Sequence, residues 1–265
     1  MIQFNFNRFG KLAKWSLTKD KRYFVKSFLQ MFVVMLLVFM FFTEMTNTNS
    51  VPDPNYKACG TIVLIAFAIQ FVFGPSIMFY SMEGKHDMQT LMALPASNFE
   101  KYLMRYSTWI ILLPLLLVAF FGADLLQYLF HLVLGHDYGR LVASALMDTL
   151  SDEVFQKEIN SPNAPRFWTS FIVMGIWFHS VFALGATFFR SRKFSGMLSL
   201  MVIILIGMLI LWLTPKQSAL QYGEESSTLA FVMGNVIYIS WILLNFWLSY
   251  RLFCRTQVIG KFVNL

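Results

Sequence analysis

Charged residues are scarce in this sequence, and cysteine is nearly absent. Only 13% of the 265 residues are charged, against about 25% in soluble domains, whereas 57% are hydrophobic. A soluble chain could not cover so much apolar surface, which excludes a soluble globular domain. The two cysteines, Cys59 and Cys254, belong to no CxxC or Cys/His cluster. We therefore expect neither a disulfide framework nor a metal site.

Long apolar runs fill the rest of the chain. Six of them match the roughly 20 residues that an α-helix needs to cross the hydrocarbon layer. The sequence therefore predicts an all-α integral membrane protein with a single transmembrane domain over residues 1–265. A bend is expected at Gly74-Pro75 in the second span. The predicted spans are 25–43, 59–80, 103–123, 167–189, 194–213 and 229–250.

The charges divide unequally between the loops. If the N-terminus lies inside, 16 of the 21 basic residues fall on the inner side, and ten of the 14 acidic residues fall outside. The positive-inside rule then predicts a multi-pass protein of the inner (cytoplasmic) membrane with both termini inside. The net charge of +7 reflects this orientation. No basic cluster belongs to a foldable soluble module, so nucleic acid is not an expected partner.

The N-terminal segment, residues 1–24, is basic but has a regular pattern. Phe6, Phe9 and Trp15 recur at helical spacing, while Arg8 lies on the other side. This pattern predicts an amphipathic interfacial helix with its aromatic face on membrane lipid. A basic tail that only sets orientation is the alternative.

Two polar features belong to the predicted outer half. In the outer segment, residues 135–166, apolar residues recur every four positions and predict one amphipathic helix: Val142, Leu146, Leu150 and Val154. Three polar residues, Asp124, Gln127 and His131, lie at i, i+3 and i+7 and continue the third span outward. A helix end that faces water explains this spacing better than acid–base chemistry does.

The stretch between the second and third spans breaks and restarts. Met88, Leu91 and Met92 recur at i, i+3 and i+4, which predicts a short cytoplasmic helix with one apolar edge. Pro95 cannot continue that helix. The pattern Ser97-x-x-Glu100 then predicts a capping box that opens a new helix into the third span.

Residues 82–106, "MEGKHDMQTLMALPASNFEKYLMRY", resemble the segment between spans two and three of type-2 ABC exporter permeases. In that family an acidic residue and glycine precede a Thr-Leu pair, a small-Leu-Pro turn with serine, and a basic residue. This chain differs in carrying its large outer segment between spans three and four. The matching positions are Glu83, Gly84, Thr90, Leu91, Ala93, Leu94, Pro95, Ala96, Ser97 and Lys101.

The resemblance implies a partner and a site. Family members pair with a second permease copy, or a related permease, and with two cytoplasmic ABC ATPase subunits that hold ATP and magnesium. No cofactor is then expected in this chain. The segment 83–94 would be a coupling helix that docks on the ATPase, and its docking residues would be Glu83, Asp87, Met88, Leu91 and Met92. The joint into span three would comprise Pro95, Ser97, Glu100 and Lys101.

The sequence contains no ATP-binding motif that could power transport. No glycine-lysine pair is followed by Ser or Thr, so the phosphate-binding loop of an ATPase is absent. A secondary transporter needs ionisable groups deep in the membrane. Lys26 and Arg105 lie near span ends, from which their long stems can reach the headgroups. Only His179, near the middle of span four, can titrate there; it is either a bonded structural residue or a proton-relay or substrate contact.

Two further classes stay open. An intramembrane serine protease would need a Gly-x-Ser site with a histidine on another span, and at Ser195-Gly196 the order is reversed; an H-E-x-x-H pattern does not occur. A structural or immunity-type membrane protein would need no motif at all. The prediction is therefore a non-enzymatic ABC transporter permease, with export implied by the resemblance. The Leu, Ile, Phe, Met and Val of its spans suit an amphipathic or lipid-like substrate.

Overall fold

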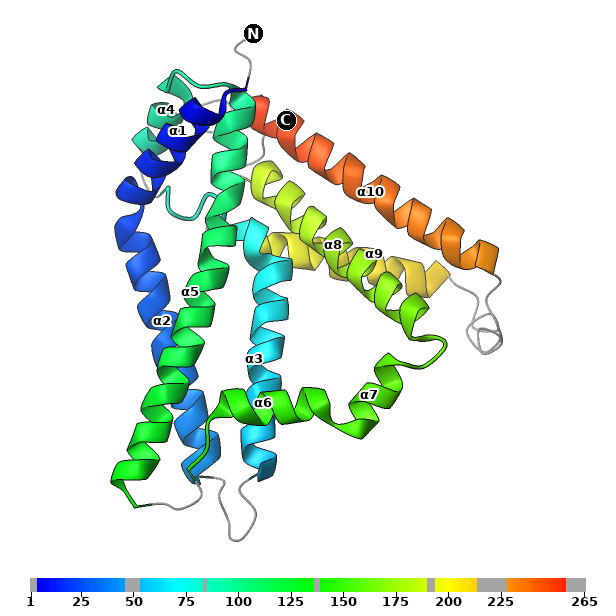
Figure 1. The fold of residues 1–265 in the computed structure, drawn as a ribbon. Coiled ribbons are helices and arrows are strands. Elements are labelled where there is room, and N and C mark those ends of the chain that lie inside the picture. The colour runs from blue at the N-terminus through cyan, green and yellow to red at the C-terminus, as the bar shows by residue number, and fades with distance from the viewer. Residues whose placement is uncertain are drawn as a thin grey trace. The chain divides into compact units, whose positions relative to one another are not determined.

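The computed structural model describes residues 4–45, 53–82, 85–135, 139–189, 194–213 and 228–255 (Figure 1). Within these ranges the secondary structure is helical and no β-strand forms, which confirms the predicted all-α fold. The chain divides into two compact units. Unit one comprises residues 1–16, 72–108 and 166–265, and unit two comprises residues 17–71 and 109–165.

Within the described residues, five helices are long and apolar enough to cross a membrane, so the chain is a multi-pass membrane protein. They correspond to the first four predicted spans and to the sixth. The fifth predicted span corresponds to a helix whose described apolar part, Ser195–Leu209, is shorter. The five helical stretches that qualify, each of which can extend beyond the hydrocarbon layer at its ends, are Lys21–Glu44, Asn55–Ile77, Asn98–Val133, Ala164–Phe188 and Phe231–Cys254.

Unit one is built around a single buried cluster to which five helices contribute. Leu12, Leu91 and Phe253 come from three helices far apart in the sequence, and all three are buried in it. The predicted bend at Gly74-Pro75 coincides with a change of helix type, because a 3₁₀ turn begins there. The elements of unit one are α1 (Phe6–Lys19, as far as Ser16), η2 (Gly74–Ile77), α4 (Lys85–Ala93), the start of α5 (Asn98–Val133), α8 (Ala164–Phe188), α9 (Ser195–Leu213) and α10 (Thr228–Cys254).

A row of hydroxyl groups joins α5, α8 and α10. Ser249 Oγ donates to the carbonyl oxygen of Ala183 over 3.0 Å, and Thr187 Oγ1 donates to Ser249 Oγ over 3.2 Å. Tyr102 Oη also shares a 3.0 Å hydrogen bond with Ser249 Oγ. Small polar residues of this kind hold membrane helices together, since lipid offers them no other partner.

Unit two has its own core, formed by α2, α3, α5 and α6. The π-helical turn η1 continues α2 directly. Residues 109–133 of α5 belong to this unit, while its first residues belong to unit one. The remaining elements are α2 (Lys21–Met40), η1 (Phe41–Met45), α3 (Asp53–Phe73), α6 (Val142–Ser151) and α7 (Glu153–Ile159). The core residues are Met35, Phe39, Tyr56, Cys59, Val63, Leu116, Phe120, Ala123, Val142 and Ala145.

The outer segment differs from its prediction. Instead of one amphipathic helix it contains two, because the backbone is extended at Asp152, with φ −60° and ψ 136°, between α6 and α7. Asp124 is not on a water-facing helix end either. Its carboxylate is buried and accepts hydrogen bonds from the backbone N–H groups of Val142 and Ala143, at 2.7 and 2.9 Å. It thereby caps the first turn of α6.

The other two members of the predicted polar stripe are also buried. His131 Nδ1 lies 2.8 Å from the Glu44 carboxylate, and its Nε2 lies 3.1 Å from Thr43 Oγ1. Gln127 Nε2 donates to Tyr56 Oη over 3.2 Å. The stripe therefore faces the interior of unit two, where it bonds α5 to η1, α3 and α6. The spacing correctly predicted that the three residues share one face of the helix, but the prediction that this face contacts water is wrong.

Candidate coupling site

The short helix α4 ends where the sequence predicts. It runs from Lys85 to Ala93, and Pro95 follows it outside any helix. Lys101 Nζ donates to the carbonyl oxygen of Met92 over 2.7 Å. The last carbonyls of a helix lack intrahelical partners and carry a partial negative charge, which an ammonium group satisfies. Lys101 thus joins the end of α4 to the start of α5.

The predicted capping box is confirmed. The backbone N–H of Ser97 donates to Glu100 Oε2 over 2.8 Å, and the N–H of Glu100 donates to Ser97 Oγ over 3.2 Å. α5 begins at Asn98, directly after this N-cap. The exchange satisfies two backbone donors at the helix start and fixes the direction in which α5 leaves the turn.

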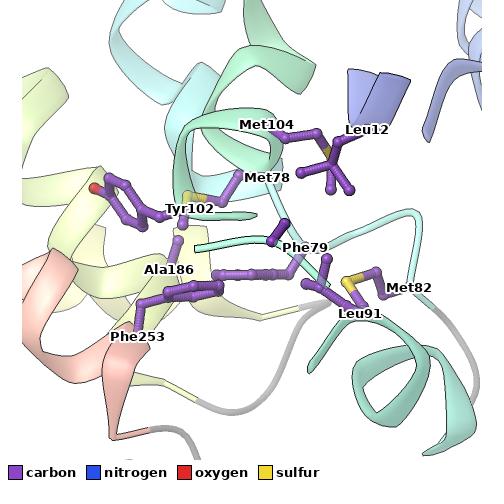
Figure 2. Packing of buried hydrophobic residues seen from close by; sticks show 10 residues of the cluster. Leu12, Met78, Phe79, Met82, Leu91, Tyr102, Met104, Ala186 and Phe253 are labelled. Atoms are coloured by element: carbon purple, nitrogen blue, oxygen red, sulfur yellow. The ribbon is translucent and has the colours of Figure 1, made fainter. Parts of the chain in front are cut away.

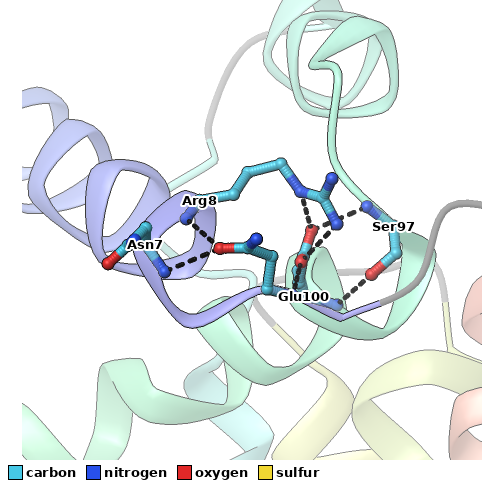
Figure 3. Close-up of polar contacts among 5 residues, drawn as sticks. Asn7, Arg8, Ser97 and Glu100 are labelled. Carbon is cyan, nitrogen blue, oxygen red and sulfur yellow. Dashed lines mark hydrogen bonds and ion pairs between the residues drawn. The ribbon is translucent and has the colours of Figure 1, made fainter.

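The side chain of Glu100 also forms hydrogen bonds with residues at the start of the N-terminal helix α1 (Figure 3). Arg8 donates from Nε to Oε2 over 2.8 Å and from Nη2 to Oε1 over 2.6 Å, a bidentate pair. The N–H of Asn5 donates to Oε1 over 2.8 Å. The side chain of Asn5 caps α1 by accepting from the N–H of Asn7 over 2.9 Å. One fully buried carboxylate therefore connects α1 to α5.

The electrostatics of Glu100 follow from these contacts. α5 is about 54 Å long at 1.5 Å per residue, far more than the ~30 Å hydrocarbon layer, and its polar first turn precedes the predicted span at residue 103. The hydrogen bonds from Arg8 lower the pKa of Glu100 to about 2, although its burial acts in the opposite direction. The same contact raises the pKa of Arg8 above its usual value. The pair stays ionised at neutral pH.

The apolar edge of α4 faces the interior of unit one (Figure 2). Leu91 is fully buried, and Met88 and Met92 pack against the same cluster. Leu91 is therefore not available as a docking residue, and Met88 and Met92 are only partly so, which corrects the prediction. The exposed residues of α4 are instead His86, Gln89, Thr90 and Ala93, beside the half-buried Asp87. The cluster around Leu91 contains Leu12, Met78, Phe79, Met82, Ala96, Tyr102, Met104, Ala186 and Phe253.

Helix α1 uses its apolar side in the same way. Leu12 is buried in this cluster, and Phe9 and Trp15 pack against it, whereas Phe6 is 80% exposed. The predicted helix is confirmed, but much of its aromatic face lies on protein instead of lipid. Sequence periodicity identifies an apolar face without specifying what it contacts.

Two other predicted positions have defined contacts. Arg105 is fully buried, and its Nη1 donates to Ser81 Oγ over 3.1 Å, so it does not extend to the headgroups as predicted. His179 is buried with Nε2 2.6 Å from Tyr106 Oη. This is a histidine bonded to a hydroxyl between two helices, the structural alternative stated above. Glu83 lies outside the described residues.

The contact between Arg8 and Glu100 was missed by sequence reasoning. The two residues are 92 positions apart, and Arg8 read only as part of a basic helix face. The capping-box pattern identified Glu100 but predicted only one of the hydrogen bonds that its carboxylate accepts, the bond from the N–H of Ser97. No local pattern indicates a tertiary ion pair of this kind, because it depends on how α1 packs.

Comparison with known proteins gave no match: no family model, no curated protein and no solved structure matches the chain. Among the described residues, no group of three or more His, Cys, Asp or Glu side chains could hold a metal ion. The site is therefore characterised by its contacts. It is a short surface helix, α4, fixed to α1, α5, α8 and α10 by a shared core and by two charged side chains of α5.

Proposed function

We propose that this chain is the membrane-spanning permease subunit of an ATP-binding-cassette transporter. It crosses the inner membrane six times with both termini inside, with α9 as the fifth span. It pairs with a second permease and is powered by a separate cytoplasmic ATPase. The direction is export of an amphipathic or lipid-like substrate. The observation that carries the proposal is the attachment of α4, the helix that resembles the family's coupling helix.

A coupling helix has to pass force into the membrane without bending at its base. Burying Leu91 contributes about 1.5–3 kcal/mol against leaving it exposed. Lys101 and Glu100 add charge-assisted hydrogen bonds at the turn between α4 and α5. These bonds are stronger than neutral ones. A displacement of α4 by an ATPase would therefore reach α5, α1 and α10 together.

The docking face follows from the burial pattern. Because the Met88–Leu91–Met92 edge is turned inward, an ATPase would contact the opposite side of α4. That side carries Gln89, Thr90 and Ala93 in exposed positions. Asp87 in the first turn, half-buried, would border it, and Glu83 would precede it. This face is small and polar, which suits a partner that binds and releases during a cycle.

Gln89→Arg tests this docking face. We expect co-purification with the ATPase to fall at least about tenfold, since an unmatched charge at an interface costs more than 1.4 kcal/mol. Membrane insertion should be unchanged. Gln156→Arg on α7 is the matched control, because Gln156 is also an exposed glutamine with one local hydrogen bond. The captured subunit must show ATPase activity in the purified complex.

Two results would contradict the proposal. The first is equal ATPase association for both variants together with no change in transport. The second is ion transport or hydrolysis by the isolated chain. Leu91→Asp separates docking from folding: it places a charge in the core, so it should lower the unfolding temperature and not association alone.

A further inference from the structure

Helix α2 has a face that the other described residues leave uncovered. Two adjacent rows of residues, each at a spacing of four, point away from unit two and are exposed. Together the two rows line an open, shallow groove of about 1030 Å³, a volume just above the usual range of small-molecule sites. One row contains Lys21, Val25, Leu29 and Val33, and the other contains Arg22, Lys26, Gln30 and Val34.

The groove has a cationic end and an apolar remainder. Lys21, Arg22 and Lys26 lie within the first two turns of α2. The side chains of these three residues make no hydrogen bond or ion pair with another described residue. Beyond Lys26 the lining is apolar except for Gln30. An occupant must therefore present a negative charge at one end and hydrocarbon along the rest.

The length of the apolar part indicates what the occupant is. From Lys26 to Val34, the last residue that lines the groove, the helix rises about 12 Å at 1.5 Å per residue. One leaflet of a bilayer contributes about half of the ~30 Å hydrocarbon thickness. If the cationic end lies at headgroup level, the apolar strip therefore extends through most of a single leaflet.

We propose that this groove binds one anionic phospholipid. Arg22 and Lys26, one helical turn apart on the same side, hold the phosphate, and Lys21 adds a third positive charge. An acyl chain lies along Val25, Leu29 and Val33. The proposal concerns the isolated chain and holds whether or not an ATPase binds it.

A second copy of the chain fits the groove less well. Two copies inserted with the same orientation and related by a two-fold axis would place the same strip against itself. Lys21, Arg22 and Lys26 of each copy would then face the same three positive charges of the other copy, and like charges repel. A lipid phosphate neutralises the same cluster.

Native mass spectrometry of the purified full chain in neutral detergent tests the site. Phosphatidylglycerol and phosphatidylcholine with identical acyl chains are titrated separately. We expect phosphatidylglycerol to bind at least about tenfold more tightly. The triple variant Lys21→Gln/Arg22→Gln/Lys26→Gln should weaken its binding about 100-fold, since each basic residue near anionic lipid contributes about a factor of five.

The matched control changes net charge equally but leaves the groove intact. Lys11→Gln/Lys57→Gln/Lys157→Gln alters three lysines on α1, α3 and α7, and should retain phosphatidylglycerol binding. Leu29→Trp keeps all three cations but fills the apolar strip, and should also weaken binding. If the triple charge variant fails to fold, lipid binding by Leu29→Trp still tests the proposal. Inorganic phosphate at millimolar concentration should not displace the lipid.

Three outcomes would overturn the proposal. Equal loss in both triple variants would indicate a net-charge effect without a site. Displacement by inorganic phosphate would indicate an anion site in which the groove has no role. Disulfide crosslinking of Leu29→Cys between two copies in the membrane, in a chain lacking Cys59 and Cys254, would assign the groove to a second copy.

Discussion

Glu100 shows how one residue can hold a junction between helices. Its carboxylate accepts from backbone N–H groups of Asn5 and Ser97 and from two nitrogens of Arg8. A buried carboxylate is costly unless such partners surround it. Here such partners do surround it, so the contact between α1 and α5 depends on the ionisation of the Glu100 carboxylate alone. The sequence indicated only the local half of this arrangement, the bond to Ser97.

The lowered pKa of Glu100 predicts a pH dependence of stability. The folded pKa of about 2 lies below the usual value of 4.5, so the ionised group stabilises the fold fully above about pH 4.5. This contribution is lost as the pH falls toward 2. Glu100→Gln keeps the capping pattern but not the charge. Its unfolding temperature in detergent should lie below that of the unchanged chain near pH 6, and the two should converge near pH 2.

Exposed Glu153 supplies the control for this measurement. Glu153→Gln removes a carboxylate from the first turn of α7, where no contact with Arg8 exists. Its stability difference from the unchanged chain should show no comparable convergence. If Glu100→Gln and Glu153→Gln behave alike across this range, the buried ion pair contributes nothing to stability.

At the scale of elements, α8 and α9 approach closely at one glycine. A Cβ atom on Gly185 would overlap the Oγ atom of Ser199 and lie 2.9 Å from its Cβ. Gly185→Ala should therefore lower the free energy of unfolding by about 1–3 kcal/mol, the usual cost of overpacking. Gly175 lies on the same helix with open space around it. Gly175→Ala should be neutral or stabilising, because alanine favours the helix.

Thermal unfolding of both variants in detergent measures this difference. Equal unfolding temperatures for Gly185→Ala and Gly175→Ala would contradict the close approach of α8 and α9. Such contacts between small residues are a common way of bringing membrane helices together. Neither glycine is distinguishable in the sequence, since both lie in an apolar run.

Helix α4 illustrates what periodicity predicts and what it leaves undecided. The spacing of Met88, Leu91 and Met92 correctly predicted a helix with one apolar edge, and Pro95 correctly predicted its end. The edge was assigned to a partner, yet it packs within the chain. Apolar surface is removed from water equally well by either contact, so the pattern alone cannot distinguish them.

At the scale of the whole molecule, the number of spans determines where the ends lie. Among the described residues, five helices meet the length and composition of a membrane span, and the apolar part of α9 is shorter. If α9 crosses the membrane, the chain has an even number of spans, and both termini lie in one compartment. We expect reporters fused to Met1 and Leu265 to agree and to give the inner location. A reporter inserted at residue 150, in the outer segment, should give the opposite result.

A reporter that gives an outer location for either terminus would show that α9 does not cross the membrane or that the predicted orientation is wrong. The number of spans depends on helix α9, because each of the other five helices is long enough to cross the membrane. The loop charges alone favour six spans, because six spans with the N-terminus inside would place 16 of the 21 basic residues on the inner side. The reporter data would decide between the charge pattern and the helix lengths.

Composition and periodicity by themselves determined the membrane character, the helical class, the apolar segments and the capped turn at Ser97, because each depends on neighbours in the sequence. The tertiary structure decided the rest: that Leu91 and Leu12 share a core, that Asp124 caps α6, and that Arg8 meets Glu100. These contacts join residues from separate helices. An apolar or charged side chain is satisfied equally by lipid, partner or self, so only the packing of the helices selects among them.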